Sequence, residues 1–81
     1  MKGGITIKNY NLIRARKNEG YTQVELSNIL KCNKSTISNW ENGVSSPTLR
    51  MAFALSAILE SDINVLFQDY KVQEFQSMNT A

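Results

Sequence analysis

The sequence predicts an all-α domain of five short helices, and three observations lead to this prediction. Apolar residues recur at three- and four-residue spacing along much of the chain. Most segments with this spacing begin at a residue that caps helices, and two are followed by a glycine. The 81 residues suffice for one domain. Such a domain hides only roughly 60% of its unfolded surface, so self-association would stabilise it.

The first helix is expected over residues 9–18. Leu12, Ala15 and Arg16 share one face of it. Gly20 follows where a left-handed residue commonly ends a helix.

The second helix is expected over residues 23–30. Thr22 and Glu25 form a capping box, in which each side chain bonds the other residue's backbone N–H. The expected inward residues are Leu26, Ile29 and Leu30.

The third helix, over residues 34–42, follows a link of only three residues. Asn33 is the expected N-cap, and Gly43 can close the helix. Ile37 and Trp40 point to the same, inward side. A link this short allows only a tight turn between the second and third helices.

The fourth helix is expected from Ser46 as N-cap and Pro47 as first helical residue to about residue 59. Its expected inward residues are Leu49, Ala52, Phe53, Ser56 and Leu59. The fifth runs over residues 63–67 and is capped by Asp62. Residues 1–8 form an arm or a short strand, and residues 68–81 form a tail that is a candidate dimerisation segment.

The composition argues against an enzyme, a metal centre and a membrane protein. The chain has no histidine, and Cys32 is its only cysteine. It therefore lacks the residues of a Ser–His or Cys–His nucleophilic site and of a Cys/His zinc site. No apolar run approaches the roughly 20 residues of a membrane span, and the first ten residues do not resemble a signal peptide. We expect a cytoplasmic protein without cofactor, metal or small-molecule ligand.

The charges are distributed unevenly along the chain. Residues 1–50 hold eight basic and three acidic side chains, whereas residues 51–81 hold one basic and four acidic ones. A basic half favours a polyanionic partner such as nucleic acid. The outer face of the third helix supports this reading, because it carries only small or polar side chains and the major groove is wide enough to admit a helix. These side chains are Lys34, Ser35, Ser38, Asn39 and Asn42.

Over residues 9–67 the sequence resembles the lambda-repressor/Cro-like, or Xre-type, helix-turn-helix domains. The strings that carry the resemblance are Gly20-Tyr21-Thr22-Gln23, Ser35-Thr36-Ile37-Ser38 and Trp40-Glu41-Asn42-Gly43, together with Leu12, Arg16, Glu25-Leu26, Leu30, Pro47, Leu49, Ile63 and Leu66-Phe67. Three positions depart from the family pattern. Lys31 replaces a glycine in the turn after the second helix, and Ser27 replaces an alanine within that helix. Glu60 replaces a glycine at the end of the fourth helix, so this helix is expected to end differently.

The resemblance implies a sequence-specific, double-stranded-DNA-binding transcriptional regulator. It assigns base reading to Lys34, Ser35 and Asn39. It assigns phosphate or secondary contacts to Gln23, Asn33, Thr36, Ser38 and Asn42, and a structural ion pair to Arg16 and Glu41. An ordinary solvated face, with Asn33 and Asn42 acting only as caps, is the alternative for these polar residues.

The resemblance further implies a repressor of phage or mobile-element type that acts as a homodimer on two half-sites. The candidate dimerisation residues are Phe67, Tyr70, Val72 and Phe75. The alternative is a protein-interaction module with the same fold, such as an antitoxin or an antirepressor target. The basic arm at Lys2 could also reach DNA, or belong to a strand at Ile5 and Ile7.

Overall fold

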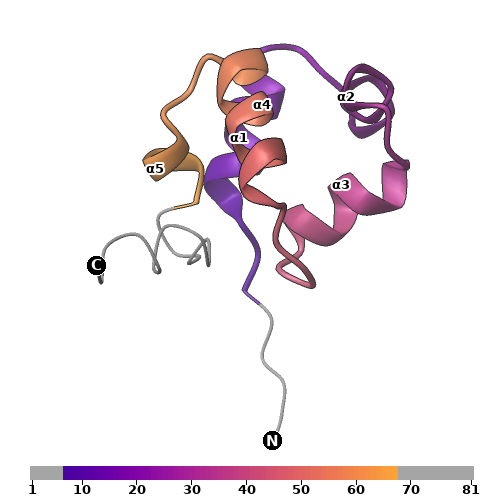
Figure 1. Ribbon diagram of the computed structural model, residues 1–81, viewed down its shortest axis with the longest axis horizontal. Helices are drawn as coiled ribbons and strands as arrows, with labels where there is room; N and C mark the ends of the chain where they lie inside the picture. The colour runs from indigo at the N-terminus through magenta and orange to yellow at the C-terminus, as the bar shows by residue number, and fades with distance from the viewer. Residues whose placement is uncertain (1–6, 68–81) are drawn as a thin grey trace, which may run out of the picture.

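The computed structural model describes residues 7–67, which form five α-helices and no strand. The helices are α1 (Tyr10–Asn18), α2 (Gln23–Leu30), α3 (Lys34–Glu41), α4 (Leu49–Leu59) and α5 (Ile63–Leu66). Figure 1 shows α2 and α3 on one side of the molecule and α5 on the other, with α1 and α4 between them. The predicted all-α, five-helix fold is therefore confirmed.

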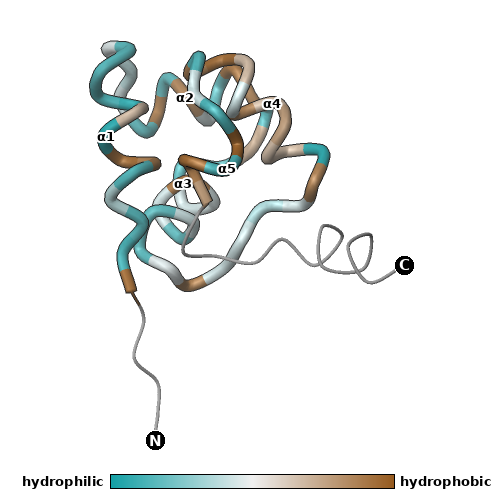
Figure 2. Tube along the Cα trace, turned by 90° about the vertical axis from the view of Figure 1, so that its left-hand side faces the viewer, coloured by the Kyte–Doolittle hydropathy of each residue, from teal (hydrophilic) through white to brown (hydrophobic). Residues whose placement is uncertain are grey.

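A single apolar cluster joins these helices. Its buried members are Leu12, Leu26, Ile37, Trp40, Ala52, Leu55, Leu59, Leu66 and Phe67. Figure 2 shows a largely hydrophilic α1 and a largely hydrophobic α4. Helix α1 contributes Leu12 and Ala15 to this cluster, whereas α4 contributes six residues between Leu49 and Leu59. Within the described residues no helix is long and apolar enough to cross a lipid bilayer.

Several helix starts follow from local side-chain bonds. The Thr22 hydroxyl accepts from the N–H of Glu25, and the Glu25 carboxylate accepts from the N–H of Thr22, so the expected capping box is present. Asp62 caps α5 by accepting from the N–H of Asn64 at 2.7 Å. Asn33 occupies the N-cap position of α3 but makes no capping bond with its side chain.

The expected start of the fourth helix was wrong. The helix begins at Leu49, because the Thr48 hydroxyl accepts from the N–H of Met51 at 3.2 Å and takes the capping role expected of Ser46. Pro47 is buried and precedes the helix instead of opening it.

Two expected inward residues lie on the surface. Phe53 is 53% exposed, because Ala52, Leu55 and Leu59 define the inward face of α4, and each lies about 100° or more around the helix from Phe53. Ile29 is 45% exposed, since Leu26 and the half-buried Leu30 fill the contact of α2 with the core. The predicted helical period was correct in both helices, but the predicted inward face included one exposed residue in each.

Two helices end at a non-glycine residue in the left-handed region. Lys31 has φ 60° and Glu60 has φ 51°, which are the conformations that the family's glycines would supply. The expectation that α4 would end differently is thus wrong, because Glu60 adopts the glycine-like geometry. Each such residue costs about 1 kcal/mol relative to a residue without a Cβ.

Candidate nucleic-acid interface

The link between α2 and α3 is a tight turn held by backbone bonds. Lys31 turns the chain in the left-handed conformation, and the N–H of Cys32 donates to the carbonyl of Ser27 at 2.9 Å. Leu26 of α2 and Ile37 of α3 are both fully buried in the core. The turn and these two side chains fix α3 against α2.

The outer side of α3 is uncovered. Lys34, Ser35 and Asn39 are exposed, and so is Asn33 just before the helix. The helix buries Ile37, Trp40 and Glu41. Ser35 and Asn39 face away from Ile37 and Trp40, and Lys34 lies beside them in the first turn, so the residues expected to read bases share one solvent-facing surface.

The remaining polar residues of α3 border this surface. Thr36, Ser38 and Asn42 are half-buried. The Asn42 amide Nδ2 donates to the Ser38 hydroxyl at 3.1 Å, which ties the last turn of α3 to the residue that ends it. The helix ends at Glu41, one residue earlier than expected, with Asn42 as its C-cap.

A buried charged network holds the C-terminal end of α3 in place. The Arg16 guanidinium donates to both carboxylate oxygens of Glu41, through Nε to Oε2 and through Nη2 to Oε1 at 3.2 Å. The Arg16 side chain is 8% exposed and that of Glu41 is 2% exposed. Arg16 also donates through Nη1 to the carbonyl of Tyr21 at 2.7 Å. This pair joins α1, the start of α2 and the end of α3.

Gln23 joins the same network, which sequence reasoning missed. Its amide Nε2 donates to Glu41 Oε1 at 2.9 Å. Gln23 and Glu41 are 18 positions apart, so no local sequence pattern predicts this hydrogen bond. Gln23 stands at the first position of α2, where backbone N–H groups point outward and favour anions. The bond therefore orients a polar side chain beside an anion-favouring helix end.

Asn9 is a second positioning residue that sequence reasoning missed. Its side-chain oxygen caps α1 by accepting from the N–H of Leu12, and its amide donates to the carbonyl of Leu66 at 2.7 Å. Its backbone N–H donates to the carbonyl of Glu41 at 2.8 Å. Asn9 is buried. It therefore joins the start of α1, the end of α3 and the end of α5 inside the protein.

The described residues contain no group of three histidine, cysteine, aspartate or glutamate side chains able to hold a metal ion. Burial raises the pKa of the Cys32 thiol, which disfavours the reactive thiolate.

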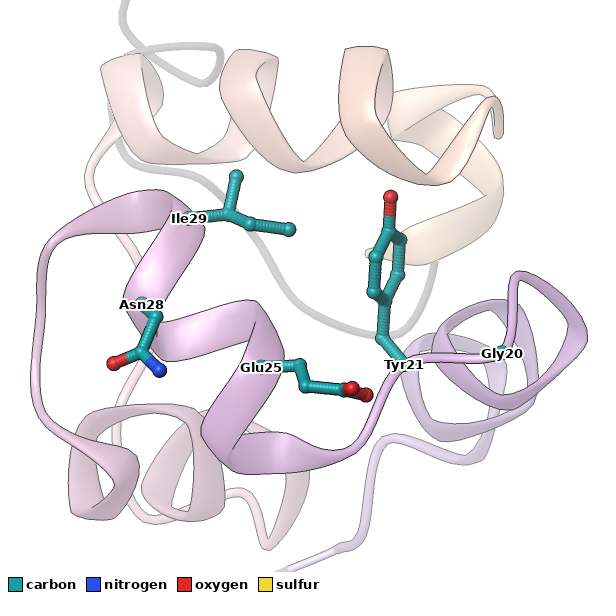
Figure 3. A pocket seen from close by; sticks show the side chains of 5 residues that line it. All are labelled: Gly20, Tyr21, Glu25, Asn28 and Ile29. Atoms are coloured by element: carbon teal, nitrogen blue, oxygen red, sulfur yellow. The ribbon is translucent and has the colours of Figure 1, made fainter.

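A hollow of about 380 Å³ lies beside α2. Gly20, Tyr21, Glu25, Asn28 and Ile29 line it, and Tyr21 and Ile29 point toward α4 (Figure 3). It lies on the side of α2 that faces α4, whereas α3 packs elsewhere on α2. The hollow is therefore separate from the polar surface of α3.

The structure changes the set of dimerisation candidates. Phe67 is 5% exposed and belongs to the core, so the expectation that it lies on a dimer surface was wrong. The end of α5 packs inward and carries Phe67 with it. Tyr70, Val72 and Phe75 lie outside the described residues, as does the arm up to residue 6. Ile7 and Lys8 have no strand geometry.

Comparison with known proteins places this geometry in a family. A helix-turn-helix family model matches residues 12–66, which is more than half of the chain. The chain is 44% identical over 55 residues to the HTH-type transcriptional regulator DicA of Escherichia coli (strain K12). The match covers 67% of this chain but only 41% of DicA. No solved structure matches the chain. The chain belongs to the Xre-type, lambda-repressor-like helix-turn-helix family, a family of DNA-binding transcription regulators.

Proposed function

We propose that this protein is a sequence-specific regulator of transcription that inserts α3 into the major groove of double-stranded DNA. The observation that carries the proposal is the exposed surface of Lys34, Ser35 and Asn39, on a helix whose other side is fixed by the core and by the Arg16–Glu41 pair. A groove-reading helix must be uncovered and rigidly held, and α3 is both.

The exposed residues of α3 suit the edges of bases. The Asn39 amide can form two hydrogen bonds with adenine, at N6 and N7. Lys34 can donate to guanine O6 and N7, and the Ser35 hydroxyl can both donate and accept. In this proposal these three side chains select the DNA sequence.

The residues around α3 suit the phosphate backbone. Gln23 lies at the N-terminus of α2 and Asn33 just before α3, while Asn42 follows α3. Thr36 and Ser38, which are half-buried, supply secondary contacts. Phosphate contacts set the register of α3 in the groove and carry no direct sequence information.

One helix reads only a few base pairs, so we propose that two copies bind two half-sites as a homodimer. The half-site centres then lie about 34 Å apart, or a multiple of one helical turn. When such an operator overlaps a promoter, the bound protein blocks transcription. We therefore propose a repressor of phage or mobile-element type that acts in the cytoplasm. DicA, of which this chain covers less than half, carries the name of a transcriptional regulator.

A salt series tests the proposal. The wild-type chain is mixed with a pool of randomised duplexes at low salt, and binding is followed by gel shift. Binding is expected to weaken steeply as salt rises, because each neutralised phosphate releases a counterion. Sequencing of the bound fraction is expected to yield a preferred motif. Absence of any shift at low salt would contradict the proposal and favour a protein-interaction module.

A further inference from the structure

Lys31 combines a strained backbone with a charged side chain. Among residues 7–67 the left-handed region is occupied by Gly20, Gly43, Lys31 and Glu60. Two of these four positions therefore keep a Cβ where glycine would cost less free energy. A strained residue that persists points to a role for its side chain.

The two strained side chains carry opposite charges and lie in different parts of the molecule. Lys31 stands in the turn that leads into α3, whereas Glu60 ends α4 and leads to α5, on the other side (Figure 1). DNA is a polyanion, so a cation near α3 attracts it and an anion far from α3 repels it least. Both charges therefore suit DNA that is bound at α3.

The Lys31 side chain is available to an anion, whereas the backbone of its turn is not. Lys31 is exposed, and no carboxylate among residues 7–67 forms an ion pair with it. Its backbone N–H donates to the carbonyl of Asn28 at 3.3 Å. The next N–H, that of Cys32, donates to the carbonyl of Ser27 at 2.9 Å. A phosphate beside this turn is therefore met by the Lys31 ammonium group.

Lys31 lies close to the residues that the proposed function places on DNA. Asn33, a proposed phosphate contact, is two residues further along, so the two Cα atoms are at most about 7 Å apart. Lys34, a proposed base-reading residue, begins α3 one position later. The flexible four-carbon stem of lysine extends the ammonium group beyond the turn.

We infer that Lys31 binds a phosphate of the DNA backbone beside the N-terminal end of α3. The inference rests on the proposed function and adds one residue to the same interface. Because a phosphate contact carries no direct sequence information, Lys31 strengthens binding to all sequences alike. It does so at the expense of folding stability, since glycine at this position would relieve the strain.

Two variants of Lys31, measured for DNA binding and for stability, test the inference. Lys31→Gln removes the charge and keeps the Cβ, whereas Lys31→Gly removes both. Each is expected to bind the selected duplex about eightfold more weakly than wild type at about 0.1 M salt, and to flatten the slope of log affinity against log salt by about 0.9, as loss of one phosphate contact requires. Only Lys31→Gly is expected to raise the urea midpoint of unfolding, because only this variant relieves the strain.

Two controls separate a phosphate contact from other effects of charge. Lys31→Arg keeps a cation on a long side chain and is expected to keep the wild-type slope. Arg14→Gln removes an exposed charge from α1, at a position about 160° around the helix from Arg16, whose side chain bonds to Glu41 of α3. It is also expected to keep the wild-type slope.

The outcomes separate this inference from the proposed function. A wild-type slope in Lys31→Gln and Lys31→Gly overturns the inference alone, and it assigns Lys31 only to the end of α2, where a cation interacts favourably with the helix dipole. A loss of affinity confined to particular sequences also overturns it. A wild-type chain that binds no duplex overturns the proposed function and the inference with it.

Discussion

Gln23 and Glu41 are joined by a hydrogen bond of 2.9 Å that ties the first residue of α2 to the last residue of α3. The same Glu41 carboxylate accepts from Arg16 of α1. One buried carboxylate therefore sets where a proposed phosphate-contacting side chain lies relative to the proposed reading helix. The proposed division of labour between phosphate and base contacts depends on this link.

Replacing Asn39 tests base reading. Asn39→Ala is expected to cost about 1–3 kcal/mol in binding to the selected duplex and to relax the preference at one base position. Gln23→Ala is the matched comparison, and it is expected to weaken all sequences alike because phosphate contacts carry no sequence information. Competition binding against duplexes that vary one position at a time measures both. Unchanged preference and affinity in Asn39→Ala would refute its assigned role.

Replacing Glu41 tests the buried pair. Glu41→Ala leaves the Arg16 guanidinium buried without its carboxylate, and we expect a loss of about 3–5 kcal/mol in the free energy of unfolding. Urea denaturation followed by Trp40 fluorescence measures it. The double variant Arg16→Met with Glu41→Leu is expected to recover much of the loss, because no unpaired charge remains. A loss below about 1 kcal/mol in the single variant, typical of exposed pairs, would show that the pair is not buried in solution.

Replacing Asn9 separates capping from bridging. Asn9→Ser keeps an oxygen that can cap α1 but removes the amide Nδ2 that donates to the Leu66 carbonyl, and the shorter side chain does not replace it. The unsatisfied buried carbonyl is expected to cost about 1–3 kcal/mol. Asn9→Ala removes both bonds and is expected to cost more. Thr48→Ala, which removes only the exposed cap of α4, serves as the control at about 1 kcal/mol. Equal stability of the Ser variant and wild type in urea would argue against the bridge.

Replacing Glu60 tests the left-handed end of α4. Glu60→Gly is expected to raise the free energy of unfolding by up to about 1 kcal/mol, because it removes the Cβ from a residue at φ 51°. Glu60→Ala keeps the Cβ and is expected to bring no such gain. Thermal unfolding compares the three chains. DNA binding should not change, since Glu60 belongs to the far end of α4, and a destabilised Gly variant would contradict this geometry.

Local signals in the sequence were sufficient for much of the fold and for the exposed surface of α3. The capping box at Thr22 and the cap at Asp62 involve residues only two or three positions apart, so the local sequence predicts them. The start of α4 was missed because Ser46-Pro47 and Thr48 offer competing start signals two residues apart. In the structure Thr48 caps the helix while Pro47 is buried ahead of it, and neither feature follows from the local sequence alone.

The positioning bonds of the site could not be read from the sequence. Gln23 and Glu41 are 18 positions apart, and Asn9 and Leu66 are 57 apart. Bonds over such separations follow from the tertiary arrangement of helices and leave no periodic trace. For the same reason Phe67 looked like a surface residue, since the direction in which the end of α5 turns depends on Asn9 and the core.

The most direct test of the central claim is an NMR titration of the isotope-labelled chain with a duplex selected from the randomised pool. The account predicts that the largest shift changes fall on Lys34, Ser35 and Asn39, with smaller ones at Gln23 and Asn42. Changes confined to the hollow around Tyr21 and Ile29, with the α3 signals unmoved, would contradict it.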